Sequence, residues 1–250
     1  MSEWKTLDNR FVVFLDIMGF KDLISRSSPD DVYKKMLKLN KIRKTIDEFF
    51  NFDFIRDLKL SPNLELRSVM FSDSILIVSI NDSIEAAMNL LLFCNNFLAH
   101  CMNYAIPIKG AVAHGQFTFD SENSIYFGQP LIDAYQLEED LKLYGIVMHH
   151  SFESKLFSYD SEHPLYKNSN FFVLNYKTPF QNKNIYHYNL NWIHRAISEY
   201  SLDVEPLGEE KMIAKWLSQF YKTVSNQPRI YVDNTNEFIK YFFKDIYKKI

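Results

Sequence analysis

The chain has 250 residues, a length that allows one large domain or one domain with a helical appendage. Hydrophobic residues make up 47% of the sequence and charged residues 24%, proportions typical of a globular protein. The net charge of −3 gives no general electrostatic attraction to nucleic acid, so a polyanionic ligand must be bound by a local cluster of cations or metal ions. We therefore expect no nucleic-acid partner.

The sequence contains no candidate for a signal peptide or a membrane span. Its first ten residues, MSEWKTLDNR, are charged and include no apolar stretch. The longest apolar run, from Met88 to Cys94, is far too short to cross a bilayer. Cys94 and Cys101 are the two cysteines, and their spacing on one predicted helix indicates core residues. We expect a cytoplasmic protein that does not contact a membrane.

The first half of the chain is predicted to alternate strands and helices. The expected elements are a strand over 11–17, a helix from about 28, strands over 64–71 and 75–80, and a helix over 82–103. The two middle strands are joined tightly around Ser72-Asp73-Ser74, which indicates a β-hairpin, although the turn lacks the usual Asn-Gly pair. Gly19-Phe20, directly after the first strand, is expected to open a helix.

The second half continues this alternation and ends in helices. The expected elements are a strand over 106–114, a helix over 129–143, a strand over 146–149, and strands over 171–176 and 185–190. Helices are expected over 191–200, 209–224 and 234–249, with a break at Gln227-Pro228. Because helices interleave with a hairpin, we expect an α+β sandwich with one central, mainly antiparallel sheet. Residues 1–190 are predicted to form one domain, and residues 191–250 a C-terminal helical extension packed on it.

Two aspartates are candidates for chemistry. Asp16 ends an apolar strand, where a carboxylate is costly to bury unless a cation or a hydrogen-bond donor meets it. Asp73 lies at the tip of the predicted hairpin. Taken singly, Asp16 is explained as a helix N-cap and Asp73 as a common turn residue.

Considered together, the two aspartates indicate a metal site. If the first strand lies beside the hairpin, Asp16 and Asp73 face each other at one sheet end, and they repel unless they share a proton or a cation. Hard divalent ions such as Mg²⁺ or Mn²⁺ prefer oxygen ligands and commonly bind one or two carboxylates plus substrate phosphates. The pair therefore predicts a site for two divalent metal ions.

Four segments resemble class III nucleotide cyclases, the superfamily of adenylate and guanylate cyclase catalytic domains, and occur in the family's order. They are Phe14-Leu15-Asp16-Ile17-Met18-Gly19-Phe20, Phe71-Ser72-Asp73-Ser74, Lys109-Gly110-Ala111-Val112-Ala113-His114-Gly115, and the helix led by Gly128 that continues to Leu137-Glu138. Within this class the sequence is most similar to the pyrimidine (uridylate and cytidylate) cyclases of bacterial Pycsar antiphage defence. That similarity lies in the Phe-Ser-Asp-Ser and Lys-Gly-Ala segments and in residues 234–239.

The resemblance implies a ferredoxin-like, palm-type sandwich and a phosphorus–oxygen lyase. In that reaction the 3′-hydroxyl of a nucleoside triphosphate attacks its own α-phosphate and releases pyrophosphate. Carried over by position, Asp16 and Asp73 bind both metal ions, the Ile17 carbonyl is a further ligand, and backbone N–H groups from Met18 to Phe20 hold the terminal phosphates. Sites of this family are built between two domains, so a homodimer with the active site at its interface is implied.

The sequence departs from the family on the Gly-led helix. Purine cyclases carry an Asn and an Arg there, and the corresponding residues are Ile132 and Gln136. Gln136 can donate a hydrogen bond but supplies no charge, so another cation must take the place of the Arg. Lys109 and Lys183 are the candidates.

The residues that would read the base also differ. Val69 and Ile125 stand at purine-reading positions, which disfavours a purine. Arg67 has the same strand parity as Val69 and Asp73, and its donors suit the carbonyl groups of a pyrimidine, uracil slightly better than cytosine. Tyr126 either stacks on the base or packs internally.

The leading hypothesis is a pyrimidine cyclase. It would convert UTP, or else CTP, to the 3′,5′-cyclic monophosphate (cUMP or cCMP), as a second-messenger synthase in antiphage defence. The alternatives are a catalytically inactive module of the same fold that binds nucleotide or a protein partner, and a purine cyclase.

Overall fold

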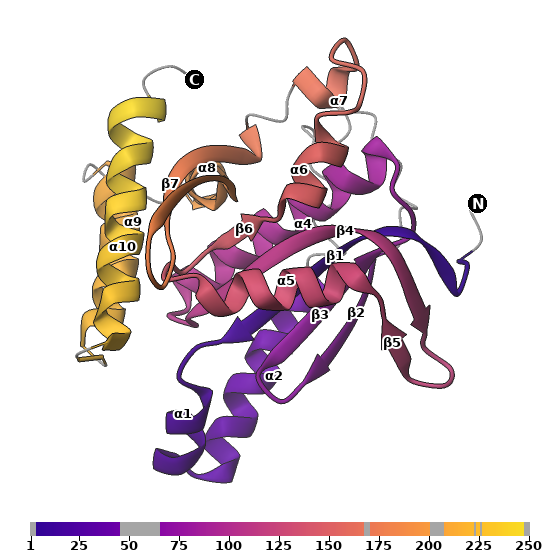
Figure 1. Ribbon diagram of the computed structural model, residues 1–250. Helices are drawn as coiled ribbons and strands as arrows, with labels where there is room; N and C mark the ends of the chain where they lie inside the picture. The colour runs from indigo at the N-terminus through magenta and orange to yellow at the C-terminus, as the bar shows by residue number, and fades with distance from the viewer. Residues whose placement is uncertain are drawn as a thin grey trace.

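The computed structural model describes residues 4–45, 66–167, 171–200, 208–222, 224–225 and 227–247 (Figure 1). The strands are β1 (Leu7–Ile17), β2 (Leu66–Phe71), β3 (Ser74–Ser79), β4 (Ile108–Asp120), β5 (Ile125–Phe127), β6 (Ile146–Met148), β7 (Val173–Pro179) and β8 (Asn184–Leu190). The helices are α1 (Phe20–Arg26), α2 (Pro29–Thr45), α4 (Ile84–Asn103), α5 (Gln129–Asp140), α6 (His150–Leu156), α7 (Pro164–Lys167), α8 (Trp192–Tyr200), α9 (Glu209–Tyr221), α10 (Gln227–Tyr241) and the π-helical turn η4 (Phe242–Ile246).

All eight described strands belong to one sheet. Seven of them follow the order β2-β3-β1-β4-β6-β8-β7, and β5 pairs with the far end of β4. Among the described strands, β4 and β6 form the one parallel pair, and the other pairs are antiparallel. The expected α+β architecture with one mainly antiparallel sheet is therefore confirmed.

The sheet buries its two faces in different ways. Side chains alternate between the faces along β1, so Phe11, Val13 and Leu15 join the main core, in which α4 is buried along nearly its whole length. Ser83 caps α4, since its hydroxyl accepts a hydrogen bond from the Ala86 N–H at 3.2 Å. The apolar character of α4 on all sides explains why it lies inside the molecule.

The opposite face carries a smaller apolar cluster and α5. Val12, Val78, Phe117 and Phe119 form this cluster. Helix α5 lies across β1 and β4 on this side, in front of the sheet in Figure 1. Because α5 covers only part of the face, the ends of β2 and β3 remain partly exposed.

The C-terminal helices pack beside the β7 edge, at the left of Figure 1. Tyr176 of β7 contacts Phe238 of α10 with ring centroids 5.0 Å apart. Tyr144, just before β6, donates its backbone N–H to the Thr235 hydroxyl at 3.0 Å. Helix α10 is thus attached both to the sheet edge and to the segment that follows α5.

Several element boundaries differ from those expected. Strand β4 continues past Gly115 to Asp120, because its second part pairs with β5, a short strand that the sequence did not predict. Helix α5 ends at Asp140 rather than 143. Helix α10 starts at Gln227, where a break was expected, because Pro228 in a first helical turn needs no N–H partner. The expectations for residues 46, 64–65, 223 and 248–249 lie outside the described residues.

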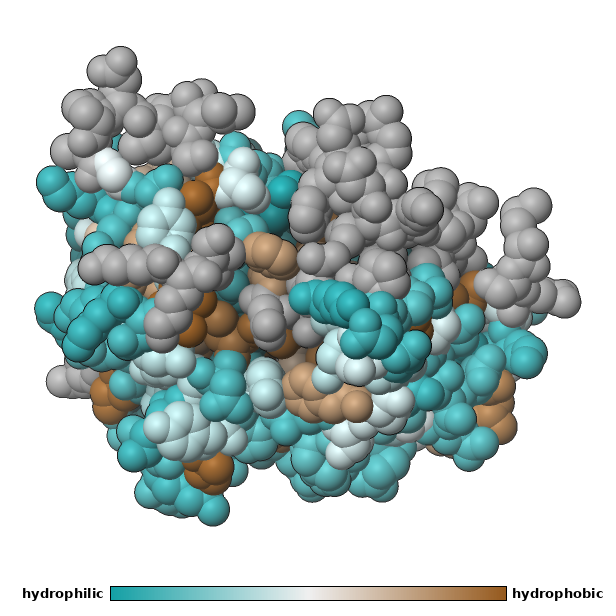
Figure 2. Space-filling view, turned by 90° about the horizontal axis from the view of Figure 1, so that it is seen from above, coloured by the Kyte–Doolittle hydropathy of each residue, from teal (hydrophilic) through white to brown (hydrophobic). Residues whose placement is uncertain are grey.

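None of the described helices is long and apolar enough to cross a membrane. In the view of Figure 2, hydrophilic residues make up most of the coloured surface, and the hydrophobic ones lie in separate patches. Apolar side chains are instead concentrated in the core between the sheet and α4.

Candidate functional site

The fold brings Asp16 and Asp73 to the same end of the sheet. The register of β1 with β3 places Asp16 opposite Ser74, and Asp73 directly precedes Ser74 in the turn between β2 and β3. The Ile17 N–H donates to the Asp73 carbonyl oxygen at 2.9 Å, which attaches this turn to the end of β1. The turn depends on Ser72, whose φ of 56° lies in the left-handed region.

The electrostatics of Asp16 are those of an uncompensated carboxylate. Burial raises the pKa of Asp16, and the negative charge of Asp73 raises it further, whereas Lys109 and Lys21 act in the opposite direction. Asp16 and Asp73 are both half-buried, so water screens their repulsion only in part. A cation placed between the two carboxylates would relieve this repulsion.

The donor set fits a divalent metal ion. Asp16 and Asp73 supply two carboxylates, and Ile17 supplies a backbone carbonyl next to Asp16. In the part of the chain that the structure describes, no group of three or more His, Cys, Asp or Glu side chains is arranged to hold a metal. A site of two carboxylates suits Mg²⁺ or Mn²⁺ that completes its coordination with phosphate oxygens and water.

Of the three backbone amides expected to hold phosphates, one is hydrogen-bonded within the sheet region and two lie at the start of α1. The Met18 N–H donates to the Pro107 carbonyl oxygen at 2.9 Å, so the expectation for Met18 is not met. Gly19 has φ 73° and precedes α1, and Phe20 begins that helix. The first amides of a helix have no acceptor within it, so Gly19 and Phe20 remain candidates.

Lys109 lies beside Asp16 in the β1–β4 register, but its ammonium group is directed to α5. The residue is 5% exposed. Its Nζ lies 2.9 Å from Glu138 Oε1 and donates to the carbonyl oxygens of Glu138 and Glu139 at 2.9 and 3.3 Å. The buried ammonium is thus directed at the end of α5 through two hydrogen bonds and one ion pair, so Lys109 is not placed to contact a substrate.

Lys183 is in a different situation. It lies exposed in the turn between β7 and β8, where its carbonyl oxygen accepts from the Phe180 N–H at 2.9 Å. Phe180 forms a β-bridge with Leu141, the residue that follows α5. The turn therefore lies beside the end of α5 nearest to Asp16, and Lys183 remains a candidate cation.

Ile132 and Gln136, the two residues that stand in place of the Asn and Arg of purine cyclases, lie on one side of α5. Gln136 is exposed, and Ile132, one turn earlier, is 49% exposed. Tyr135 contacts Phe14 of β1 at a ring-centroid distance of 5.5 Å and is still 47% exposed. Gln136 is therefore on the outer, solvent-facing side of α5.

Arg67 and Tyr126 lie near each other, toward the opposite end of the sheet from the aspartates. The Arg67 guanidinium carbon is 4.1 Å from the centroid of the Trp4 ring. Trp4 and Tyr126 both pack on Phe119, at centroid distances of 5.3 and 4.7 Å. Four residues of extended strand separate Arg67 from Phe71, at the start of the hairpin turn. Arg67 is therefore about 13 Å along the strand from the turn that carries Asp73. Trp4 gave no sequence signal, because it stands alone before the first strand.

A second group of charges is compensated internally. Asp82 Oδ2 lies 2.9 Å from Lys155 Nζ and 3.0 Å from His114 Nε2, and the Tyr159 hydroxyl donates to the Asp82 carbonyl at 2.6 Å. Burial alone would raise the pKa of Asp82, but the hydrogen bonds and charges of Lys155 and His114 outweigh it and lower this pKa. The arrangement links β4 to α6 and is structural.

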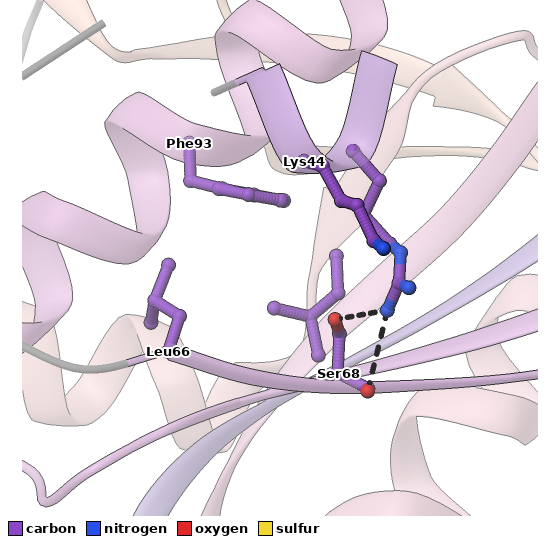
Figure 3. Close-up of a pocket in the computed structure, with 6 residues that line it drawn as sticks. Lys44, Leu66, Ser68 and Phe93 are labelled. Carbon is purple, nitrogen blue, oxygen red and sulfur yellow. Dashed lines mark hydrogen bonds between the residues drawn. The ribbon is translucent and has the colours of Figure 1, made fainter. Parts of the chain in front are cut away.

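A cavity of about 180 Å³ lies on the other face of the sheet from Asp16 (Figure 3). Its lining residues are Arg43, Lys44, Leu66, Ser68, Ile77 and Phe93. Arg43 donates to the carbonyl oxygen of Ser68 at 3.3 Å and also bonds to its hydroxyl, so part of its guanidinium is used within the wall. None of the expected site residues lines the cavity, which is separate from the candidate site.

No protein-family model matches the chain, and no curated protein matches its sequence. Solved structures similar to it include a bacterial light-regulated adenylyl cyclase, with 14% identity, TM-score 0.45, and coverage of 86% of this chain and 99% of that one. The guanylyl cyclase domain of the RhoGC fusion protein from the aquatic fungus Blastocladiella emersonii has 19% identity, TM-score 0.46, and coverage of 76% and 98%. The adenylyl cyclase CyaB from P. aeruginosa has 11% identity, TM-score 0.44, and coverage of 74% and 94%. Likeness at this level carries no argument about activity.

Proposed function

We propose that this chain is a nucleotide cyclase that uses two divalent metal ions, Mn²⁺ or Mg²⁺. The observation that carries the proposal is the meeting of Asp16 and Asp73 at the end of β1 and the β2–β3 turn. The two residues are 57 positions apart in the sequence (73 minus 16), and each repels the other in the absence of a cation. Such an unfavourable pair is typical of a site kept for a ligand.

The proposed reaction is an intramolecular displacement at phosphorus. The 3′-oxygen of the nucleotide forms a bond to the α-phosphorus, the bond from that phosphorus to the bridging oxygen breaks, pyrophosphate leaves, and the hydroxyl proton passes to water. Metal ions bound here would supply charge neutralisation at the attacking and leaving oxygens. Asp16 and Asp73 would hold the metal ions, and the amides at Gly19 and Phe20 and the Lys183 side chain would hold the triphosphate.

A second copy of the chain would complete the site. Gln136 is on the outer side of α5, and Arg67 and Tyr126 lie toward the other end of the sheet from the aspartates. We propose that a partner subunit presents these residues to the nucleotide bound at Asp16 and Asp73. Large apolar side chains are exposed on the face that carries Asp16: Phe71 is 81% exposed, Ile132 49% and Tyr135 47%. Exposed apolar side chains on one face often mark a protein interface. The proposal is therefore a homodimer with the active site between its subunits.

The proposed substrate is a pyrimidine nucleoside triphosphate, UTP in preference to CTP. Val69, at a position where purine cyclases read the base, is apolar and half-buried beside the aspartate end of the hairpin. Arg67 and Tyr126 lie together around Trp4 and Phe119, an arrangement that offers donors next to aromatic rings. A role in antiphage defence is part of the proposal and depends on the resemblance to Pycsar cyclases.

The test is turnover of each of the four nucleoside triphosphates by the purified chain with Mn²⁺. One cyclic pyrimidine product is the expected result, and a cyclic purine product would overturn the substrate assignment.

Asp73→Asn is expected to lower turnover at least 100-fold, because it removes one of two metal-binding carboxylates. Asp160→Asn, at another exposed turn, is the matched control and should retain wild-type turnover.

The second candidate function is a module that binds nucleotide without converting it. Ile132 and Gln136 favour this reading, because neither can neutralise charge in the transition state. Saturable binding of a nucleotide by the wild type, with no cyclic product at any metal concentration, would select the binding module over the cyclase.

A further inference from the structure

Next to Asp16 is an ion pair that the proposed reaction does not use. Lys109 and Glu138 are 5% and 4% exposed, and their charged atoms are 2.9 Å apart. Lys109 is the β4 neighbour of Asp16 in the sheet register, and Glu138 belongs to the last turn of α5. Buried charges are costly unless they are paired, so the presence of this pair so close to Asp16 needs an explanation.

The pair fixes the distance between one strand and one helix end. The Lys109 ammonium also donates to the carbonyl oxygens of Glu138 and Glu139 in the last turn of α5, and the Glu138 oxygen accepts the Leu141 N–H at 3.0 Å as well. A cation at a helix C-terminus is favourable, because these carbonyls carry partial negative charge. One side chain therefore connects the strand beside Asp16 to the end of α5 through three oxygens.

Helix α10 supports this end of α5 from the other side. Lys142 donates its ammonium to the Tyr231 hydroxyl at 3.1 Å, and the Tyr144 N–H donates to the Thr235 hydroxyl at 3.0 Å. The Tyr231 ring centroid lies 5.8 Å from Lys109 Nζ and 5.8 Å from the Tyr144 ring. The segment after α5 is thus held between the sheet and α10.

We propose that Lys109 is a positioning residue for metal binding: with Glu138 it holds Asp16 in place against the end of α5, and α10 keeps that end in place. The inference rests on the proposed function, since it takes Asp16 as a metal ligand. It gives Lys109 no contact with the substrate.

A loss of metal affinity separates this role from a purely electrostatic one. If the pair acted only through its charges, removal of both residues would leave Mn²⁺ binding nearly unchanged, because the opposite charges of Lys109 and Glu138 largely cancel at the site. If the pair positions Asp16, its removal weakens Mn²⁺ binding, as happens when groups that orient metal ligands are lost.

The experiment measures the dissociation constant of Mn²⁺ alone, without nucleotide, from the electron paramagnetic resonance signal of the free ion. The variant is Lys109→Met combined with Glu138→Leu, which leaves no unpaired buried charge and replaces the pair with apolar side chains of similar volume. We expect the dissociation constant to rise roughly 10-fold or more. An unchanged or lower value would overturn the inference. Lys109→Arg retains the charge and the donors and should restore most of the affinity.

A second variant covers the case in which the double substitution fails to fold. Thr235→Val leaves Lys109 and Glu138 unchanged and removes the acceptor of the Tyr144 N–H. It should weaken Mn²⁺ binding in the same direction. Tyr241→Phe is the matched control, because it removes a hydroxyl from the same helix that bonds to Asn175 instead. Equal Mn²⁺ affinity in Thr235→Val and Tyr241→Phe would contradict the role of α10.

Failure of the proposed function gives a different result. If the wild type binds Mn²⁺ no better than Asp73→Asn, then the metal site itself is absent and the cyclase proposal fails. If the wild type binds Mn²⁺ and loses it with Asp73→Asn, while the Lys109 and Glu138 double variant keeps it, then only the positioning role is excluded.

Discussion

Single aspartates in this chain differ in whether their neighbours compensate their charge. Asp82 lies between Lys155 and His114, and its pKa is lowered. Asp16 has another carboxylate as a close neighbour, and its pKa is raised. Since folding alone gains nothing from the second arrangement, its presence at the end of a buried strand is best explained by a ligand that binds there.

Asp82 gives a prediction about pH. A carboxyl whose pKa is lower in the folded state stabilises the protein above its unfolded pKa of about 3.9 and loses this contribution as the pH falls through the folded value. Asp82→Asn should therefore reduce the free energy of unfolding by roughly 1–3 kcal/mol at pH 7, because it breaks hydrogen bonds to a charged group. In urea unfolding, the difference between variant and wild type should shrink below pH 4.

The control for this prediction is an exposed ion pair. Asp30 and Lys34 lie 2.6 Å apart on α2 with side chains about 70% exposed. Asp30→Asn should have a much smaller effect at both pH values, because water screens the pair. A loss of stability as large for Asp30→Asn as for Asp82→Asn would contradict the assignment of Asp82 to a compensated, structural cluster.

The sequence predicted that Asp16 and Asp73 lie close together, because this requires only that β1 lie beside a local hairpin. It did not predict the partner of Lys109, since the direction of a lysine side chain depends on where α5 ends in space. Arg67 lies two and four residues before Val69 and Phe71 on one face of β2, but strand parity says nothing about distance along the strand. Its contact with Trp4 depends on tertiary structure.

At the level of elements, the close approach of β1 and β4 depends on one glycine. A Cβ at Gly110 would collide with the Leu15 side chain and lie 2.6 Å from the Phe14 carbonyl oxygen. Gly110→Ala should therefore force the two strands apart at the positions next to Asp16 and Lys109. We expect a loss of about 1–3 kcal/mol in the free energy of unfolding, measured with urea.

A matched substitution tests this steric explanation. Gly145 lies next to the same region, since the Gly110 N–H donates to its carbonyl oxygen at 2.9 Å. A Cβ at Gly145 would lie 3.4 Å from the Leu143 side chain, which is ordinary van der Waals contact. Gly145→Ala should leave stability within about 0.5 kcal/mol of the wild type. A larger loss for Gly145→Ala than for Gly110→Ala would refute the argument.

Long elements with a strong apolar pattern were predictable, and short ones were not. The apolar pattern predicted a helix over 82–103, and α4 spans Ile84–Asn103. Strand β5 has three residues and is defined only by its pairing with β4, so no local pattern indicates it. The sequence predicts a break at Gln227-Pro228, but α10 starts at Gln227, because proline is also favoured in a first helical turn.

For the whole molecule, the proposed dimer predicts on which surface the introduction of a charged side chain disrupts the assembly. Ile132, on the outer side of α5, is 49% exposed. Ile132→Asp should convert the dimer to a monomer in light-scattering measurements and abolish turnover, because it buries a charge in the interface. Ile230 on α10 is 48% exposed, and Ile230→Asp should leave the dimer intact. Dissociation by both variants, or by neither, would exclude the α5 surface as the interface.

The architecture followed from the order of elements, but the arrangement of strands did not. A hairpin flanked by helices indicated one mixed layer of strands. The placement of β6 between β4 and β8 depends on which apolar segments find partners across the chain, and a three-residue strand carries too little information for that. The attachment of α10 beside α5 is likewise a contact between distant segments.

The shortness of β6 divides the sheet into two parts of unequal strength. On one side β4 and β1 pair along eleven residues of β1, whereas a single register pair, Val147 with Asn189, joins β6 to β8. We therefore expect the β7–β8 ribbon to separate from β6 more readily than β4 separates from β1. The amide hydrogens of β8 that face β6 should exchange with solvent deuterium before those of β1, so the turn carrying Lys183 should move more readily than the carboxylates it would serve.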